Sequence, residues 1–279
     1  MTGPTVGDTA FVLGGGGLLG AVEVGMLRAL FEAGVRPDLI LGTSVGALNG
    51  ALVAAEPGPG VIERLVGLWE AAVSTREVYG DGALRQVRRA VRTGTHLHSS
   101  EPLRERLAQE LGDLSFAELT VPFQCCAASI ERAAEHWFTH GRVVDAVMAS
   151  AAVPGLLSPA EVDGEHYLDG GIVNSVPVGR AVECGAVRLF VLQVGRVDRP
   201  LKPPRRPWEV ARVSFEIARR HRFHREMAAL PAHVTAHVLP TGGGSPKDDS
   251  LLAYRDFRAV TRRIDAAHEA STTYLREHL

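Results

Sequence analysis

A serine, an aspartate and a run of glycines are the residues of this chain whose types and spacing could do chemistry. Ser44 lies in Gly-Thr-Ser-Val-Gly, residues 42–46, which we call the serine turn. The run Gly-Gly-Gly-Gly-Leu-Leu-Gly, residues 14–20, forms the glycine turn, and an Asp-Gly-Gly segment begins at Asp169. A serine hydroxyl becomes a good nucleophile when it is exposed on a sharp turn and a base takes its proton. The combination predicts acyl transfer through a serine nucleophile.

The serine turn follows a short apolar run and precedes a stretch of small residues, 45–55. In a strained turn between a strand and a helix, Gly42 and Gly46 would relieve crowding around the nucleophile. The alternative is that Ser44 only caps the following helix, a role that serine often fills. The strand–turn–helix context favours the nucleophile.

The glycine turn offers backbone N–H groups that no side chain obstructs. A developing oxyanion needs such donors, and one of them contributes about 3–4 kcal/mol to transition-state stabilisation. We expect Gly15, Gly16 and Gly17 to supply this oxyanion site, with Gly16 and Gly17 as the main donors and Gly20 supporting the turn.

A nucleotide-binding alternative rests on the same glycines, because residues 15–20 also fit the pattern Gly-x-Gly-x-x-Gly. That pattern would make the chain an oxidoreductase, and it expects an acidic residue at the end of the second strand. Here Asp38 precedes that strand and Ser44 follows it, which disfavours a nucleotide. A third possibility is a non-catalytic lipid-binding module on a hydrolase scaffold.

The base that would activate Ser44 is either a histidine or a carboxylate. The downstream histidines considered are His221, His224, His233 and His237. None of them lies in a glycine-flanked turn, whereas Asp169 is followed by Gly170 and Gly171, which would let a substrate or another loop approach. A carboxylate held close to a hydroxyl in a partly dry site can act as the base. An ordinary Asp-Gly turn remains the alternative.

Strand-like and helix-like segments alternate along the chain, which predicts an α/β fold with a mainly parallel sheet. Strands are expected at residues 9–13, 39–41, 122–129, 135–138, 166–168, 187–194 and 234–239. Helices are expected at residues 19–33, 45–55, 61–74, 82–92, 102–111, 143–150, 208–230 and 251–275. Because the carboxyl ends of parallel strands share one edge of a sheet, the glycine turn and the serine turn should meet there.

Composition limits the class of protein. The chain has 279 residues, 46% of them hydrophobic, which suits one large domain, and its net charge of -2 gives no nucleic-acid footprint. Cys125, Cys126 and Cys184 form neither a disulfide framework nor a zinc pattern, so we expect buried thiols in a reducing compartment. Residues 1–10 lack a basic leader and residues 11–31 are too interrupted to span a membrane. A cytoplasmic protein with at most peripheral membrane contact is expected.

A basic segment connects the later strands. Its basic residues are Arg196, Arg199, Lys202, Arg205, Arg206, Arg212, Arg219, Arg220, Arg222 and Arg225. Apolar residues are interleaved with them, so the segment suits either a solvated helix face or an anionic membrane surface. The solvated face is the favoured interpretation.

The glycine turn, the serine turn and the Asp-Gly-Gly segment, in this order, resemble the patatin-like phospholipase family over residues 9–195. The resemblance implies a three-layer α/β/α sandwich and a Ser44–Asp169 dyad that cleaves lipid acyl esters without a histidine, a metal or an organic cofactor. It implies a single domain over residues 1–279, with a helical insert at about 61–112 and an extension at about 200–279. The family usually has Arg or Lys where this chain has Leu19, a departure that bears on phosphate binding more than on the backbone donors.

Overall fold

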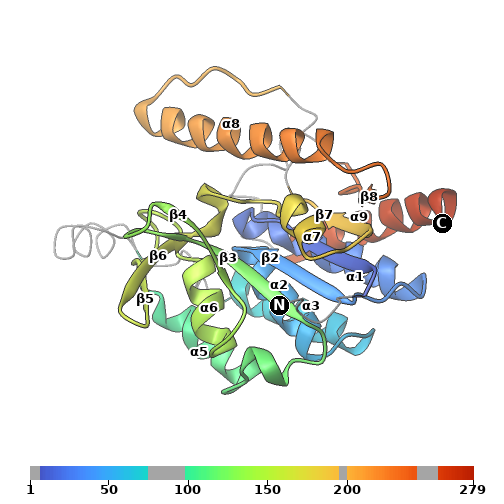
Figure 1. Ribbon diagram of the computed structural model, residues 1–279, viewed down its shortest axis with the longest axis horizontal. Coiled ribbons are helices and arrows are strands. Elements are labelled where there is room, and N and C mark those ends of the chain that lie inside the picture. Colours follow the sequence, from blue (N-terminus) through green and yellow to red (C-terminus); the bar gives the residue numbers. More distant parts are fainter. Residues whose placement is uncertain (1–6, 75–97, 195–199, 244–256) are drawn as a thin grey trace.

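The computed structural model describes residues 7–74, 98–194, 200–243 and 257–279 (Figure 1). In these ranges one eight-stranded sheet has the order β5-β6-β3-β2-β1-β7-β8, with β4 also paired to β3. The strands are β1 Thr9–Leu13, β2 Leu39–Thr43, β3 Phe123–Ser129, β4 Ala134–Phe138, β5 Ala160–Val162, β6 Glu165–Asp169, β7 Arg188–Leu192 and β8 Thr235–Val238. Strands β3, β2, β1, β7 and β8 run parallel to one another, while β4 and β6 run antiparallel to β3. The mainly parallel sheet is therefore confirmed.

Helices cover both faces of this sheet (Figure 1). They are α1 Ala21–Glu32, α2 Val45–Ala55, α3 Gly60–Ser74, α5 Glu101–Leu111, α6 Val143–Ser150, α7 Val178–Glu183, α8 Pro207–Ala228 and α9 Phe257–His278. The predicted helix at residues 82–92 lies outside the described residues. Strand β5 and helix α7 were not predicted, because three and six residues are too short to show a period.

Alternating side chains of the central strands divide the core into two parts, as the pleat of a strand requires. Phe11 and Leu13 of β1 point into the larger cluster, which α1, α2, α3, α6 and α9 complete. Ala10 and Val12 point into the smaller cluster, which includes residues of α7 and Phe223 of α8. The sheet thus lies between two helical layers, and the expected α/β/α sandwich is confirmed.

The cysteines and the helices test two further expectations. Cys125 and Cys126 are buried free thiols in β3, but Cys184 is only half-buried at the end of α7. The expectation of three buried thiols is wrong for Cys184, because a helix terminus near the surface leaves its side chain partly open.

Among the described helices, none combines the length and the apolar character needed to span a membrane.

Candidate active site

Strand β3 brings the serine turn and the Asp-Gly-Gly segment together. Thr43, the last residue of β2, pairs with Cys126 of β3, and Asp169, the last residue of β6, pairs with Ala127. Strand β4 pairs with β3 at both of these positions, so β2 and β6 must share the opposite edge. Because β2 runs parallel and β6 antiparallel to β3, their carboxyl ends meet at neighbouring register positions. Ser44 therefore follows β2 directly beside Asp169.

The serine turn is a strained connection between β2 and α2. Ser44 has φ 57° and ψ -122°, a left-handed φ that is uncommon for a residue with a side chain. A Cβ on Gly46 would lie 2.4 Å from the carbonyl oxygen of Leu13, so only glycine lets the turn pack against the end of β1. Ser44 occupies the N-cap position of α2, yet its side chain makes no capping bond. The capping interpretation is therefore not supported.

The hydroxyl of Ser44 donates instead to Asp169. The Oγ–Oδ2 distance is 2.5 Å, and the other carboxylate oxygen accepts the N–H of Gly171 at 2.7 Å. Both side chains are buried, with 5% of each residue exposed. Burial raises the pKa of Asp169 to about 6, although both hydrogen bonds act to lower that pKa. At neutral pH the carboxylate is thus ionised and can accept the serine proton.

Ser150, at the end of α6, links the backbone of Ser44 to β3. Its hydroxyl accepts the N–H of Ser44 at 2.9 Å and donates to the carbonyl of Cys126 at 2.6 Å. Sequence reasoning missed Ser150, because no local pattern marks a serine at a helix end as the partner of a residue 106 positions away.

The glycine turn lies against the nucleophile. A Cβ on Gly15 would be 3.3 Å from the Cβ of Ser44 and 3.3 Å from the Oγ of Ser175. Gly15 therefore lies in contact with both serines. The buried Oγ of Ser175 has no hydrogen-bond partner among the described residues. This buried hydroxyl was also missed from the sequence. The two turns therefore form one site, as their position at the carboxyl edge of the sheet predicted.

The expected oxyanion donors differ in their availability. The N–H of Gly15 donates to the carbonyl of Ser175 at 2.8 Å. Within the described residues, the N–H groups of Gly16 and Gly17 donate no hydrogen bond. The N–H of Val45, which follows the nucleophile and begins α2, is also without an acceptor there. Both the glycine turn and the serine turn thus contain N–H groups without an acceptor among the described residues, and Val45 is a candidate that sequence reasoning missed.

Known proteins share this sequence pattern. The sequence model described as "Patatin-like phospholipase" matches residues 11–182. The chain belongs to the patatin-like phospholipase family. Curated relatives include the neuropathy target esterase sws of Drosophila melanogaster, 29% identical over 71% of this chain, and lysophospholipase nte1 of Aspergillus terreus, 30% identical over 71%. The patatin-like phospholipase domain-containing protein 7 of Rattus norvegicus is 33% identical over 68% of this chain. This patatin-like chain spans 13%, 12% and 14% of those relatives, respectively.

Two solved structures resemble the patatin-like chain. VipD from Legionella pneumophila aligns with a TM-score of 0.47 at 13% identity, covering 99% of this chain and 67% of that one. Full-length ExoU from Pseudomonas aeruginosa, in complex with SpcU, aligns with a TM-score of 0.46 at 14% identity. That alignment covers 97% of this chain and 52% of the solved one.

A loop after Asp169, residues 169–176, joins the three motifs of the patatin-like site. The hydroxyl of Thr43, in the serine turn, donates to the carbonyl of Asn174 at 2.8 Å. The next carbonyl, that of Ser175, accepts the N–H of Gly15. Asp169 is the N-cap of a short 3-10 helix, Gly170–Ile172, and not part of a hairpin turn. We call residues 169–176 the aspartate loop.

Helix α8 lies along the outside of the molecule (Figure 1). Three of its side chains contact the glycine turn or the aspartate loop. A Cβ on Gly171 would be 3.2 Å from the Cζ of Phe215. Arg222 donates to the carbonyl of Val173 in the aspartate loop at 2.6 Å, and Arg219 contacts the glycine turn. The basic segment singled out in the sequence thus contributes to the edge of the site as well as to a solvated surface.

The alternative residues lie elsewhere. His221, His224 and His233 are exposed, and His237 of β8 stacks on Phe190 with ring centroids 5.0 Å apart. Asp38 accepts the N–H of Thr9 at 3.0 Å, at the amino ends of β1 and β2, the end of the sheet opposite the glycine turn. No acidic residue therefore takes the ribose position at the end of β2, where Ser44 stands.

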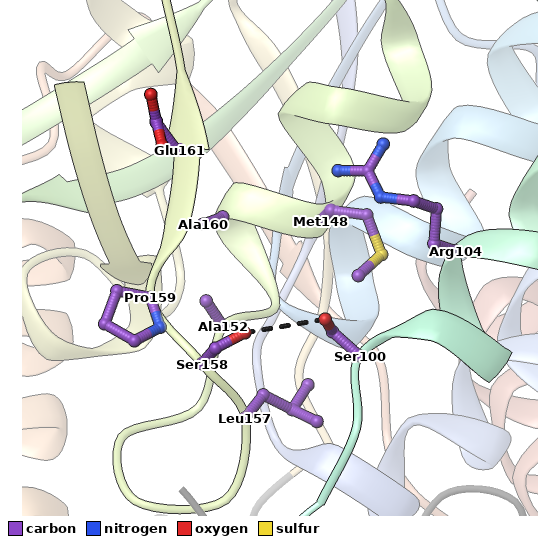
Figure 2. Close-up of a pocket in the computed structure, with 9 residues that line it drawn as sticks. All are labelled: Ser100, Arg104, Met148, Ala152, Leu157, Ser158, Pro159, Ala160 and Glu161. Atoms are coloured by element: carbon purple, nitrogen blue, oxygen red, sulfur yellow. Dashed lines mark hydrogen bonds between the residues drawn. The ribbon is translucent and has the colours of Figure 1, made fainter. Parts of the chain in front are cut away.

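A separate pocket of about 140 Å³ opens beside α5, α6 and β5 (Figure 2). Figure 2 shows the hydroxyls of Ser100 and Ser158 facing each other across it, 3.5 Å apart. Neither Ser44 nor Asp169 lines this pocket, but Ala152 does, and the carbonyl of Ala152 accepts the N–H of Asp169 at 2.9 Å. The pocket therefore lies next to Asp169 and is separate from the contact between Ser44 and Asp169.

Proposed function

We propose that this chain is a serine lipid acyl hydrolase that cleaves carboxylic esters through Ser44 and Asp169. The observation that carries the proposal is the 2.5 Å hydrogen bond between Ser44 Oγ and Asp169 Oδ2, made from a strained turn in a buried site. A serine that served only as a helix cap would bond its own helix instead.

In the first half of the proposed reaction, Asp169 takes the proton of the Ser44 hydroxyl as Oγ attacks the ester carbonyl carbon. The carbonyl electrons move onto oxygen, and the N–H groups of Gly16, Gly17 and Val45 stabilise the oxyanion. Collapse of this intermediate breaks the bond to the alcohol. Asp169 returns its proton to the leaving alcohol oxygen, and Ser44 is left as an acyl ester.

In the second half, water attacks the acyl ester and Asp169 takes a proton from that water. The same backbone donors stabilise the second oxyanion. When it collapses, the bond between Ser44 Oγ and the acyl carbon breaks, the proton returns to Oγ and the fatty acid leaves. The cycle consumes one water, and the side chains and backbone of the site carry out every proton transfer and stabilise both oxyanions.

We propose lipid carboxylic esters as the substrate class, cleaved as by a phospholipase A or another lipid acyl hydrolase. The relatives include an esterase and a lysophospholipase, and this chain spans 13% and 12% of their lengths. Leu19 gives the glycine turn no cation of its own for a phosphate headgroup. A lysophospholipid and a neutral ester of equal chain length are therefore the first pair to compare.

Contact with a lipid surface is the second part of the proposal. Among the α8 side chains that the structure describes, the large apolar residues Val210, Phe215 and Ile217 are exposed, at 50%, 39% and 56%. Arginines on the same helix could pair with anionic headgroups. Co-sedimentation with anionic vesicles should fall when Ile217 is changed to Glu, and unchanged binding would contradict this role of α8.

The decisive experiment labels the purified chain with a fluorophosphonate probe, which reacts with activated serines. Ser44 should carry the label, and Ser44→Ala should lose both labelling and ester hydrolysis while its thermal unfolding is unchanged. Ser158→Ala, a serine of the neighbouring pocket, is the matched control and should behave as wild type. Lipid binding without labelling would support the non-catalytic module instead, and tight NADH binding would support the oxidoreductase.

A further inference from the structure

Arg219 of α8 is a buried cation next to the glycine turn. Only 6% of its side chain is exposed, and its Nη2 pairs with Glu216 at 3.0 Å. Its Nη1 donates to the carbonyl of Gly15 at 3.4 Å, across 204 positions of sequence. Its Nε has no hydrogen-bond partner among the described residues. Burying a guanidinium with an unpaired N–H is unfavourable for folding, so stability alone does not account for Arg219.

The carbonyl that Arg219 holds belongs to the same peptide plane as the N–H of Gly16. In a trans peptide these two groups point in opposite directions, so fixing one fixes the other. The preceding peptides are held separately, because Gly14 N–H donates to Leu192 and Gly15 N–H donates to Ser175. Among the described residues, Arg219 makes the hydrogen bond that holds the plane between Gly15 and Gly16.

A peptide between two glycines rotates easily, because neither residue has a Cβ to restrict it. Rotation of this plane would turn the Gly16 N–H away from Ser44 and place a carbonyl oxygen near the developing negative charge. An oxyanion donor works only when it is aimed before the reaction begins. The turn itself carries no charged side chain, and Arg219 places a positive charge beside Gly15.

We propose that Arg219 is a positioning residue of the oxyanion site, which holds the Gly15 carbonyl and thereby aims the Gly16 N–H at the oxyanion formed by attack of Ser44. This inference rests on the proposed ester hydrolysis. Glu216 keeps the guanidinium in place, and the substrate need not touch Arg219. Losing Arg219 should therefore slow the chemical step without weakening substrate binding.

The test compares Arg219→Gln with Arg225→Gln, an exposed arginine in the last turn of the same helix. Loss of one oxyanion donor costs about 10²–10³-fold in kcat, and loss of its orientation should cost about 10–100-fold. We expect kcat of Arg219→Gln to fall by that factor with KM and the pH profile unchanged. Arg225→Gln should match wild type.

A second variant separates positioning from folding. Arg219→Ala leaves a cavity that added methylguanidinium can fill, and this ion should restore part of kcat. A trifluoromethyl ketone analogue of the ester, which forms a hemiketal oxyanion on Ser44, should lose affinity for Arg219→Gln in proportion to the loss of kcat/KM. If Arg219 had only a structural role, its loss would lower the unfolding temperature. Methylguanidinium would then not restore kcat, and affinity for the analogue would not fall in proportion to kcat/KM.

The outcomes distinguish this inference from the function on which it rests. If Ser44→Ala is inactive and Arg219→Gln keeps kcat within about twofold of wild type, the role of Arg219 is overturned and the hydrolase proposal stands. If Ser44→Ala keeps the activity of wild type, both proposals fail. A loss of kcat in Arg219→Gln that methylguanidinium reverses in Arg219→Ala supports the inference.

Discussion

The serine turn and the glycine turn form the two halves of one site, but they are held in different ways. The serine turn is fixed by the register of β2 with β3 and by the packing of Gly46 against the end of β1, and the hydroxyl of Ser150 accepts the N–H of Ser44. The glycine turn is held from outside, by the carbonyls of Leu192 and Ser175 and by the side chain of Arg219.

The difference means that the position of Ser44 and the orientation of the oxyanion donors depend on different contacts. The contact between Ser44 and Asp169, the proposed nucleophile and base, depends on the register of three strands, which can change only if the sheet changes. The oxyanion donors depend on contacts from α8 and the aspartate loop, which single substitutions can alter while the sheet stays intact. We therefore expect the two halves to respond differently to mutation and to pH.

The largest effect should come from Asp169→Asn, which breaks the serine half alone. An amide cannot take the serine proton, so kcat should fall about 10²–10⁴-fold, the usual contribution of a general base. The glycine turn makes no bond to this carboxylate, so affinity for substrate should stay close to wild type. Initial rates with a soluble ester measure both quantities.

The control for Asp169→Asn is Asp145→Asn on α6, which removes the ion pairs of Asp145 with Arg104 and Arg142 and leaves Ser44 and Asp169 unchanged. It should retain wild-type rates. Activity of Asp169→Asn within about tenfold of wild type would mean that another group serves as the base.

A smaller effect is expected from adding a methyl group to each turn. A Cβ on Gly46 would meet a backbone carbonyl oxygen at 2.4 Å, and one on Gly16 would meet the Cγ2 of Val194 at 2.1 Å. Overpacking costs typically about 1–3 kcal/mol, and both single variants should be destabilised in urea unfolding. Val194→Ala removes the obstructing methyl and should rescue Gly16→Ala, but no side chain can be trimmed to rescue Gly46→Ala.

A double-mutant cycle measures this contrast, with Gly46→Ala plus Val194→Ala as the control pair. We expect a favourable coupling free energy for the Gly16 pair and additive effects for the Gly46 pair. Equal coupling in both pairs would show that the two turns are not held differently.

Most of the fold was predictable because its elements are local patterns. The helices α2 and α6 have the predicted bounds, and the strands differ from prediction mainly at their ends. Ser44 and the glycine turn were found for the same reason, since a turn of glycines between a strand and a helix is visible in a few residues. The roles of Ser44, Asp169 and the oxyanion glycines remain predictions until variants are measured.

The rest of the site could not be read from the sequence, because it depends on pairing between distant segments. Nothing near Asp169 indicates that Ala127 will be its register partner, yet that pairing brings it to Ser44. Ser150 and Arg219 act across 106 and 204 positions, from helices whose own sequences are ordinary. Such contacts follow from the packing of the whole sheet and have no local pattern.

The smallest effect we expect is a dependence on pH. As pH rises, kcat/KM should increase, whereas the contribution of Asp169 to the free energy of unfolding should decrease. Burial raises the pKa of Asp169 from 3.8 to about 6, so the base is half ionised near pH 6. We expect kcat/KM to rise through that pH and to fall about tenfold per pH unit below it.

The stability of the fold should depend on the same proton in the opposite direction. The folded state holds the Asp169 proton more tightly than the unfolded state, so the contribution of this proton to stability is full below pH 3.8 and is lost as pH rises through about 6. Burial also raises the pKa of Glu23, which adds a slope of the same sign, so the measurement is the difference between the unfolding curves of wild type and Asp169→Asn. That difference should grow in favour of the variant between pH 4 and pH 7, and a constant difference would show that Asp169 has an ordinary pKa.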